Sequence, residues 1–149
     1  MKRRIIDELA FTYLQRNQKY GGSFYQSLHR HDDIAYVVQC EHKLNRIKTM
    51  TANEIVDNEE SIRDSVLDFM NYTFMFVAFK GRTAPVGDKI TLVQEYSIID
   101  YMMSAKMVMF DNSFERFVEE ILDEYFPDIV KHEPDRTNIL TAFSKHVFQ

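Results

Sequence analysis

Three acidic residues with helical spacing suggest a divalent-cation site near the middle of the chain. Glu60, Asp64 and Asp68 recur every four residues, and with Asn71 they fall within an arc of about 80° on a helix. Like charges at this spacing repel one another, so a cation between them would stabilise the arrangement. Mg²⁺ takes only a few carboxylates, with substrate phosphates and water as its other ligands. The alternative is a solvated acidic face near a helix N-terminus, where the helix dipole also favours acids.

The preceding predicted helix contributes a fourth carboxylate. Glu41 shares a helical stripe with Ile34, Val37 and Leu44, so it occupies a position where a core residue is expected. A buried carboxylate needs a cationic partner or a metal ion. Glu41 is therefore a candidate metal ligand, and a salt bridge to a neighbouring helix is the alternative.

Two basic residues follow Glu41 on the same helix. Lys43 and Arg46 are separated by three residues, so they are neighbours on a helix surface and are able to bind one phosphate group together. The alternative is that both are simply solvated. Taken together, bases on one helix and acids on the next favour a site for a phosphate group with its cation.

Hydrophobic periodicity predicts the helices that must position these side chains. Apolar residues recur at spacings of three and four, and no segment shows sustained period-2 alternation. Helices are expected at 4–18, 23–29, 32–50, 59–80, 90–110, 113–126 and 135–148. The first half of 90–110 is rich in β-branched residues, so a strand is the alternative there. A polar loop is expected at 51–58 and a turn at 81–87.

These helices predict an all-α fold, a bundle of four to six helices in a single domain over residues 1–149. Helix 59–80 is apolar nearly all round after Phe69, so we expect it to run through the centre of the bundle. Helix 32–50 is expected to bury one apolar stripe. The members of that stripe are Ile34, Val37, Val38, Leu44 and Ile47.

Composition excludes several classes of protein. The chain has 149 residues, of which 45% are hydrophobic and 28% charged, so it is long enough to bury a core. Its single cysteine, Cys40, permits no internal disulfide and fits a reducing cytoplasm. The net charge of −5 argues against general nucleic-acid binding. No apolar run has the length of a membrane span, and the first residues do not have the pattern of a signal peptide.

Three blocks of sequence resemble a known family. "NQKYGGSF", "KLNRI" and "ESIRDSVLDFMNY" are similar, in order and spacing, to the nucleotide-modification-associated domain 1 found widely in phages. The resemblance covers about residues 12–75, and residues 88–149 lie outside it as a helical extension or a dimerisation part. That family is in turn similar to the all-α nucleoside triphosphate pyrophosphohydrolases of the MazG and dimeric dUTPase group. The resemblance implies a MazG-like bundle that acts on the nucleotide pool of the phage in the host cytoplasm.

The resemblance also assigns roles to residues. It implies that Glu41, Glu60, Asp64 and Asp68 bind Mg²⁺, with Glu41 and Asp68 as further ligand or catalytic base. The substrate would be an NTP or a dNTP, hydrolysed between its α- and β-phosphates. Lys43 and Arg46 would bind the phosphates. Related bundles are often dimers, so a homodimer is expected, with the helix 90–110 as its seam.

The first block would supply the remaining contacts to the nucleotide. Lys19 would meet a phosphate and Tyr20 would stack on the base, while Gly21 and Gly22 would let the backbone approach the ligand. The alternative for the glycine pair is structural, because Gly21 would end one helix and Ser23 would begin the next.

Other functions are consistent with the same residues. The pyrophosphohydrolase signature has acids at E-x-x-E, whereas Glu41 is followed three residues later by Leu44. This departure favours a protein that sequesters a nucleotide without hydrolysing it. A third alternative is a phage protein that binds and inhibits a host or defence protein through an apolar surface. Whether the chain is an enzyme is therefore open at the level of sequence.

Overall fold

In the computed structural model, the part of the chain that is described consists of helices and short connections. The described residues are 7–9, 11–13, 15, 23–53, 59–80 and 113–148. The elements, in chain order, are α2 (Ser23–His31), α3 (Asp33–Ala52), α4 (Glu59–Lys80), α6 (Ser113–Tyr125), α7 (Glu133–Phe143) and a π-helical turn η2 (Ser144–Phe148). No strand occurs among these residues. The all-α bundle expected from the sequence is confirmed.

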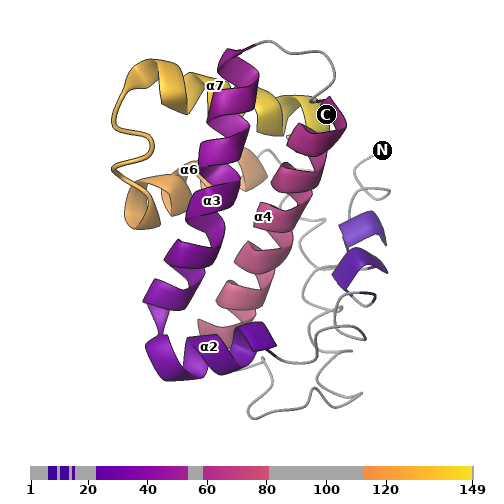
Figure 1. Ribbon diagram of the computed structural model, residues 1–149, viewed down its shortest axis with the longest axis vertical. Helices are drawn as coiled ribbons and strands as arrows, with labels where there is room; N and C mark the ends of the chain where they lie inside the picture. Colours follow the sequence, from indigo (N-terminus) through magenta and orange to yellow (C-terminus); the bar gives the residue numbers. More distant parts are fainter. Residues whose placement is uncertain are drawn as a thin grey trace.

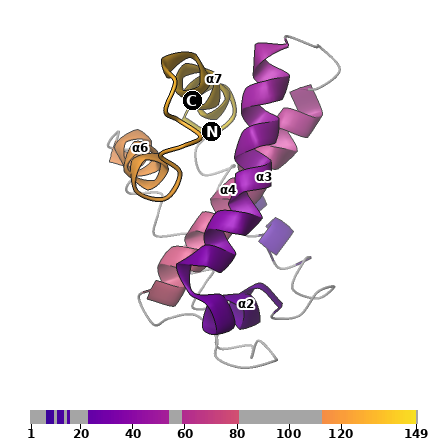
Figure 2. The ribbon, with the colours of Figure 1, turned by 60° about the vertical axis from the view of Figure 1, so that its left-hand side comes forward.

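Helices α3 and α4 form the centre of the bundle. They lie side by side, with α2 across one end of the pair and α7 across the other (Figures 1 and 2). From Ser65 to Phe76 every side chain of α4 is buried except Tyr72, which is half-buried. The expectation that this helix runs through the centre of the bundle is therefore confirmed.

The helix bounds follow local signals in the sequence. Helix α2 begins at Ser23, as expected, and continues two residues past the expected end. Asp32 alone separates α2 from α3, and its backbone N–H donates to the Leu28 carbonyl at 2.8 Å. The φ angle of Asp32 is 54°, which allows the chain to change direction within one residue. Helix α3 extends to Ala52 and so includes the first residues of the expected loop.

The C-terminal helices differ slightly from expectation. Helix α6 ends at Tyr125, one residue before the expected end and two before Pro127, which cannot continue a helix. Helix α7 begins at Glu133, two residues early, because Pro134 is well suited to the first turn of a helix. The expected single helix to residue 148 is wrong in its last turn, where the chain widens into η2.

The apolar stripe expected on α3 is wrong in part. Ile34 and Val38 are exposed, at 68% and 52%, and Val37 is half-buried. The buried stripe contains Leu44 and Ile47, as expected, but begins with Tyr36 and Cys40. The physical reason is the aromatic core: the Tyr36 ring stacks on Phe76 of α4, with centroids 4.2 Å apart. Packing of this large ring turns Ile34 and Val38 toward solvent.

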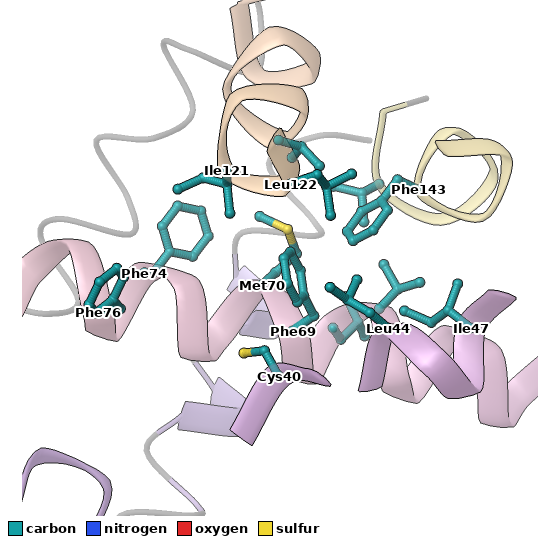
Figure 3. Close-up of a cluster of buried hydrophobic side chains, with 14 of the residues drawn as sticks. Cys40, Leu44, Ile47, Phe69, Met70, Phe74, Phe76, Ile121, Leu122 and Phe143 are labelled. Carbon is teal, nitrogen blue, oxygen red and sulfur yellow. The ribbon is translucent and has the colours of Figure 1, made fainter. Parts of the chain in front are cut away.

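Phe69 connects α4 to the C-terminal part of the core. Its ring packs edge-on against Phe126, which follows α6, and against Phe143 of α7. Figure 3 shows Phe69 and Met70 between Cys40 below and Leu122 and Phe143 above, with Leu44 beside Phe69. One buried cluster therefore holds α3, α4, α6 and α7 together.

Ion pairs join the helices at their edges. Lys80 at the end of α4 lies 2.9 Å from Asp33 at the start of α3. Arg63 forms a two-pronged pair with Glu8, at 2.6 and 2.5 Å. Lys48 lies 3.7 Å from Asp135 of α7. The Lys80–Asp33 pair joins the end of α4 to the start of α3, whereas the other two pairs join these helices to other parts of the chain.

The expected turn at 81–87, and the helix 90–110 with its dimer seam, lie outside the described residues. Among the helices that are described, none is long and apolar enough to cross a lipid bilayer.

Candidate functional site

Side chains at three successive levels join α3 to α4. Tyr36 and Thr73 share a hydrogen bond of 2.7 Å between their hydroxyl groups. One turn along α3, Gln39 Nε2 donates to the Tyr72 hydroxyl at 3.2 Å. Residue numbers rise on α3 while they fall on α4, so the two helices are antiparallel. The polar residues of α3 that follow Gln39 therefore face the first half of α4.

The third level is an ion pair between two of the residues singled out by the sequence. Lys43 Nζ lies 3.0 Å from Asp68 Oδ2, and the two side chains are 24% and 10% exposed. The buried Asp68 carboxylate thus has the cationic partner that its burial demands. An ammonium group has three donor hydrogens, so Lys43 retains the capacity to bind a second anion at this partly open edge.

Arg46 and His42 extend the basic character of this edge. Both side chains are exposed on α3. His42 lies three residues after Gln39, and Arg46 four residues after His42, which places all three within about 60° on one helix face. Lys43 borders the same face. His42, Lys43 and Arg46 are therefore neighbours on the surface of α3, and Lys43 lies beside Asp68 of α4.

Glu41 does not join this group, and its expected position in the core is wrong. The side chain is exposed. Glu41 is two residues from Gln39 and two from Lys43, so it lies about 160° around the helix from each. The reason is again the rotation of α3, whose buried stripe contains Tyr36 and Cys40 rather than Ile34 and Glu41.

The acidic face of α4 is divided between solvent and core. Asp64 is exposed, whereas Asp68 is only 7% exposed. Glu60 lies in the first turn of α4, and its side chain is outside the described part. Among the side chains that are described, no group of three or more His, Cys, Asp or Glu residues is arranged to hold a metal ion.

Two further polar side chains on α4 are buried without partners. Asn71 is 5% exposed, and neither its amide nitrogen nor its amide oxygen has a hydrogen-bond partner. The Ser65 hydroxyl, in a residue that is 1% exposed, also has none. Buried polar groups in native proteins are nearly always paired, so each unpaired one calls for an explanation. Asn71 lies three residues after Asp68, which leaves an unused oxygen donor near the ion pair.

Cys40 lies in the core beneath this edge and is not a nucleophile. Burial raises the pKa of the Cys40 thiol well above its usual value. The Lys43 ammonium lowers this pKa and the Asp68 carboxylate raises it, but neither outweighs burial. The thiol therefore stays protonated at neutral pH, and a thiolate is required for nucleophilic attack.

Lys19, Tyr20, Gly21 and Gly22 lie outside the described residues, so their expected roles stay predictions. Sequence reasoning missed Gln39 and Tyr72, whose hydrogen bond lies next to Lys43 and Asp68. The signal was present in the spacing of Ala35, Gln39, His42 and Arg46, which places them on one face of a helix.

No protein-family model, curated protein or solved structure matches this chain. The resemblance to the phage nucleotide-modification-associated domain therefore stays a prediction, and a function has to be argued from the site itself.

Proposed function

We propose that this chain binds a nucleotide through its phosphates at the edge formed by α3 and α4. The observation that supports the proposal is the ion pair of Lys43 and Asp68, 3.0 Å apart and partly open to solvent. A lysine held by a buried carboxylate has a fixed orientation, so it loses little conformational entropy when it binds a phosphate. Arg46, on the next turn, supplies the planar fork that suits phosphate oxygens.

Mg²⁺ is the cation that a nucleotide phosphate would bring to this edge. In nucleotide sites it is usually bound by one or two carboxylates, while phosphates and water complete its coordination. Asp64 is exposed and Glu60 precedes it by one turn of α4, so both fit this role. The unpartnered Asn71 amide oxygen is a further oxygen donor on this side of α4. When bound, Mg²⁺ would neutralise charge on the phosphates.

The arrangement favours binding over hydrolysis. Glu41, expected as a ligand or a base, is exposed and lies about 160° from Lys43 around α3. Asp68, the other expected base, is paired with Lys43. Hydrolysis of an NTP by attack of water on the α-phosphorus, with release of pyrophosphate, is the second candidate. It is the activity that the family resemblance implies, but of the two bases that the resemblance offers, Glu41 is turned away from Lys43 and Asp68 is paired with it.

A thermal-shift screen tests the proposal. The ligands are the ribo- and deoxyribonucleoside triphosphates, each with and without Mg²⁺. A ligand that binds only the native state at 100 times its Kd stabilises it by about 2.7 kcal/mol, which is a rise in Tm of several degrees for a chain of this size. We expect at least one nucleotide with Mg²⁺ to give such a rise. No shift with any nucleotide at millimolar concentration would contradict the proposal.

A pyrophosphate-release assay on the same panel separates binding from hydrolysis. We expect a nucleotide that raises Tm to yield no pyrophosphate above the background of the nucleotide alone. Release that requires both the protein and Mg²⁺ would instead support the second candidate.

The resemblance also leads us to propose a homodimer in the host cytoplasm. Light scattering coupled to size exclusion tests the oligomer directly. A mass near 35 kDa, about twice the 17.7 kDa of one chain, is the expected result. A mass of a single chain at micromolar concentration would contradict it.

A further inference from the structure

A pocket of about 340 Å³ opens where α2 meets α3. Two of its lining residues, Gln39 and Tyr72, lie about one helical turn from Lys43 and Asp68 respectively. Its walls come from α2, from the first half of α3 and from Tyr72 of α4. Small-molecule pockets typically measure about 300–1,000 Å³, so this one suits a single small group rather than a large cofactor. Figure 2 shows α2 lying across the end of α3, and residues of both helices line the pocket.

The walls combine apolar surface with hydrogen-bonding groups. Phe24 packs edge-on against Tyr72, with ring centroids 4.8 Å apart, and both rings line the pocket. Ser23 and Ser27 contribute hydroxyl groups from α2. Gln39 donates to the Tyr72 hydroxyl at 3.2 Å, and its amide also has a carbonyl oxygen and a second N–H hydrogen. This combination matches a planar, polar-edged group better than a saturated hydrocarbon chain.

Two large hydrophobic side chains at this pocket are exposed to solvent. Ile34 is 68% and Val38 is 52% exposed, and both line the pocket. Phe11 is the third large hydrophobic side chain that the described residues expose. Two of these three therefore meet at one place, where a bound apolar surface would remove them from water.

The pocket and the basic residues occupy one continuous face of α3. Ala35, Val38 and Gln39 line the pocket, and His42 and Arg46 continue the same face at spacings of three and four. These five positions fall within an arc of about 100°. Along this face, apolar residues are followed by basic residues within one helical turn, and Lys43 lies beside the boundary between them. A ligand that follows this face needs an apolar planar end and an anionic end.

We propose that the pocket receives the base of the bound nucleotide, while the sugar lies along α3 and the phosphates reach Lys43 and Arg46. The inference rests on the proposed nucleotide-binding function and adds the place and the chemistry of base recognition. The base contacts Phe24 and Tyr72 through its ring, Val38 through its apolar face and Gln39 through its hydrogen-bonding edge.

Isothermal titration calorimetry of the wild type and of a variant whose new side chain fills the pocket tests this inference. The probes are Mg²⁺ complexes of ATP, GTP, CTP and UTP, and Mg²⁺ with inorganic triphosphate, which has no base. The variant Val38→Trp places an indole in the pocket at a half-exposed helix position. Thr141→Trp, at an exposed position of α7, is the control for addition of a tryptophan to a helix.

We expect Val38→Trp to weaken the tightest nucleotide by at least about tenfold and to leave triphosphate affinity within about twofold, while Thr141→Trp changes neither. A second variant, Gln39→Leu, retains the apolar pocket and removes the amide. It is expected to change the order of preference among the four nucleotides by at least about threefold without weakening triphosphate.

Three outcomes would overturn the inference. If Val38→Trp binds nucleotides as tightly as the wild type, the base lies elsewhere, although nucleotide binding itself stands. If Val38→Trp loses triphosphate as strongly as nucleotide, its effect is not on the base. If the wild type is a dimer and Val38→Trp a monomer, a second copy of the chain covers the pocket. Failure of the wild type to bind any probe would instead contradict the proposed function.

Discussion

Buried polar side chains of α4 divide into those whose polar atoms have hydrogen-bond partners and those whose polar atoms have none. Thr73 donates to the Phe69 carbonyl oxygen at 2.7 Å and also contacts the Tyr36 hydroxyl at 2.7 Å. Ser65, two turns earlier on the same helix, has a buried hydroxyl with no partner. Both residues are 1% exposed. The two side chains are therefore equally buried, and they differ in whether their hydroxyl groups have hydrogen-bond partners.

This pair gives a matched prediction for stability. Ser65→Ala removes a buried donor that has no partner, so we expect the free energy of unfolding to stay the same or to rise by up to about 1 kcal/mol. Thr73→Val removes a bonded hydroxyl and leaves the Tyr36 hydroxyl without its partner, so we expect a loss of about 1–3 kcal/mol. Urea denaturation followed by circular dichroism measures both. Equal losses for the two variants would show that Ser65 has a partner in solution.

Connections between helices depend on particular backbone and side-chain features. The joint between α2 and α3 is Asp32, whose φ angle of 54° lies in the region that glycine adopts without strain. The Asp32 side chain forms no capping hydrogen bond to α3. Asp32 therefore has a backbone conformation that is unfavourable for a non-glycine residue, and no capping hydrogen bond offsets that cost.

Positive φ costs a non-glycine residue about 1–2 kcal/mol, whereas glycine loses more conformational entropy on folding. The first effect is the larger, so we expect Asp32→Gly to stabilise the fold by about 1 kcal/mol. Asp32→Val is expected to destabilise it, since a β-branched side chain tolerates positive φ poorly. Thermal unfolding of the two variants at one pH measures the difference. A lower Tm for Asp32→Gly than for the wild type would contradict this explanation of the joint.

An ion pair also joins α6 to α7. Arg136 donates to Asp123 through two N–H groups, at 2.6 and 3.3 Å. These hydrogen bonds lower the pKa of the Asp123 carboxyl below its usual value, and the Arg136 charge lowers it further. A group with a lowered pKa in the folded state stabilises that state above its unfolded pKa, and the contribution is lost as pH falls through the folded pKa.

Asp123→Asn is therefore expected to destabilise the protein at pH 7 by about 0.2–1 kcal/mol, the range for exposed pairs. The difference from the wild type should begin to shrink as pH falls below about 4, the usual value for aspartate. It should disappear below the lowered pKa of the folded state. Denaturation curves for both proteins across pH 2–7 measure this trend. A difference that persists undiminished at pH 2 would mean that charge is not its source.

Helix bounds were predictable from the sequence because their signals are local. Ser23 after a glycine pair and Pro127 after a helical stretch mark helix ends without reference to the rest of the chain. The rotation of α3 was not predictable in the same way. Tyr36 and Cys40 gain their core positions by contact with α4, through Phe76 among others, so Glu41 and Ile34 lose theirs.

The candidate site was predictable to the extent that it depends on helix faces. The proximity of Lys43 and Asp68 follows from residues that the sequence already indicated. The pocket was not predictable from the sequence, because it depends on where α2 crosses α3 and on the outward position of Val38. Spacing along one helix cannot give the angle at which another helix crosses it.

An aromatic cluster connects the central helices of the described bundle to its C-terminal helices. Phe69 contacts Phe126 and Phe143, at centroid distances of 6.0 and 5.4 Å, and is 0% exposed. These contacts connect the central helix pair to both C-terminal helices. Loss of this side chain would therefore weaken the association of α6 and α7 with the rest of the bundle, and not only local packing.

We expect Phe69→Ala to lower the free energy of unfolding by about 3–5 kcal/mol, through lost burial and the cavity that remains. Phe11→Ala is the matched control, because Phe11 is 61% exposed and its loss should change stability by no more than about 0.5 kcal/mol. Guanidinium denaturation measures both variants. A loss below 1 kcal/mol for Phe69→Ala would show that the cluster does not hold the helices together.

If a nucleotide binds at the α3–α4 edge, loss of the Lys43 side chain should weaken its binding more than loss of a lysine of equal exposure on the same helix. Lys48 provides the comparison, since its side chain is 25% exposed against 24% for Lys43, and it also pairs with an aspartate on another helix. Calorimetric titration of the tightest nucleotide, with Mg²⁺, into the wild type, Lys43→Ala and Lys48→Ala measures the requirement. We expect Lys43→Ala to weaken binding by at least about tenfold and Lys48→Ala by less than about twofold. Equal affinities for the two variants would contradict the proposed phosphate site.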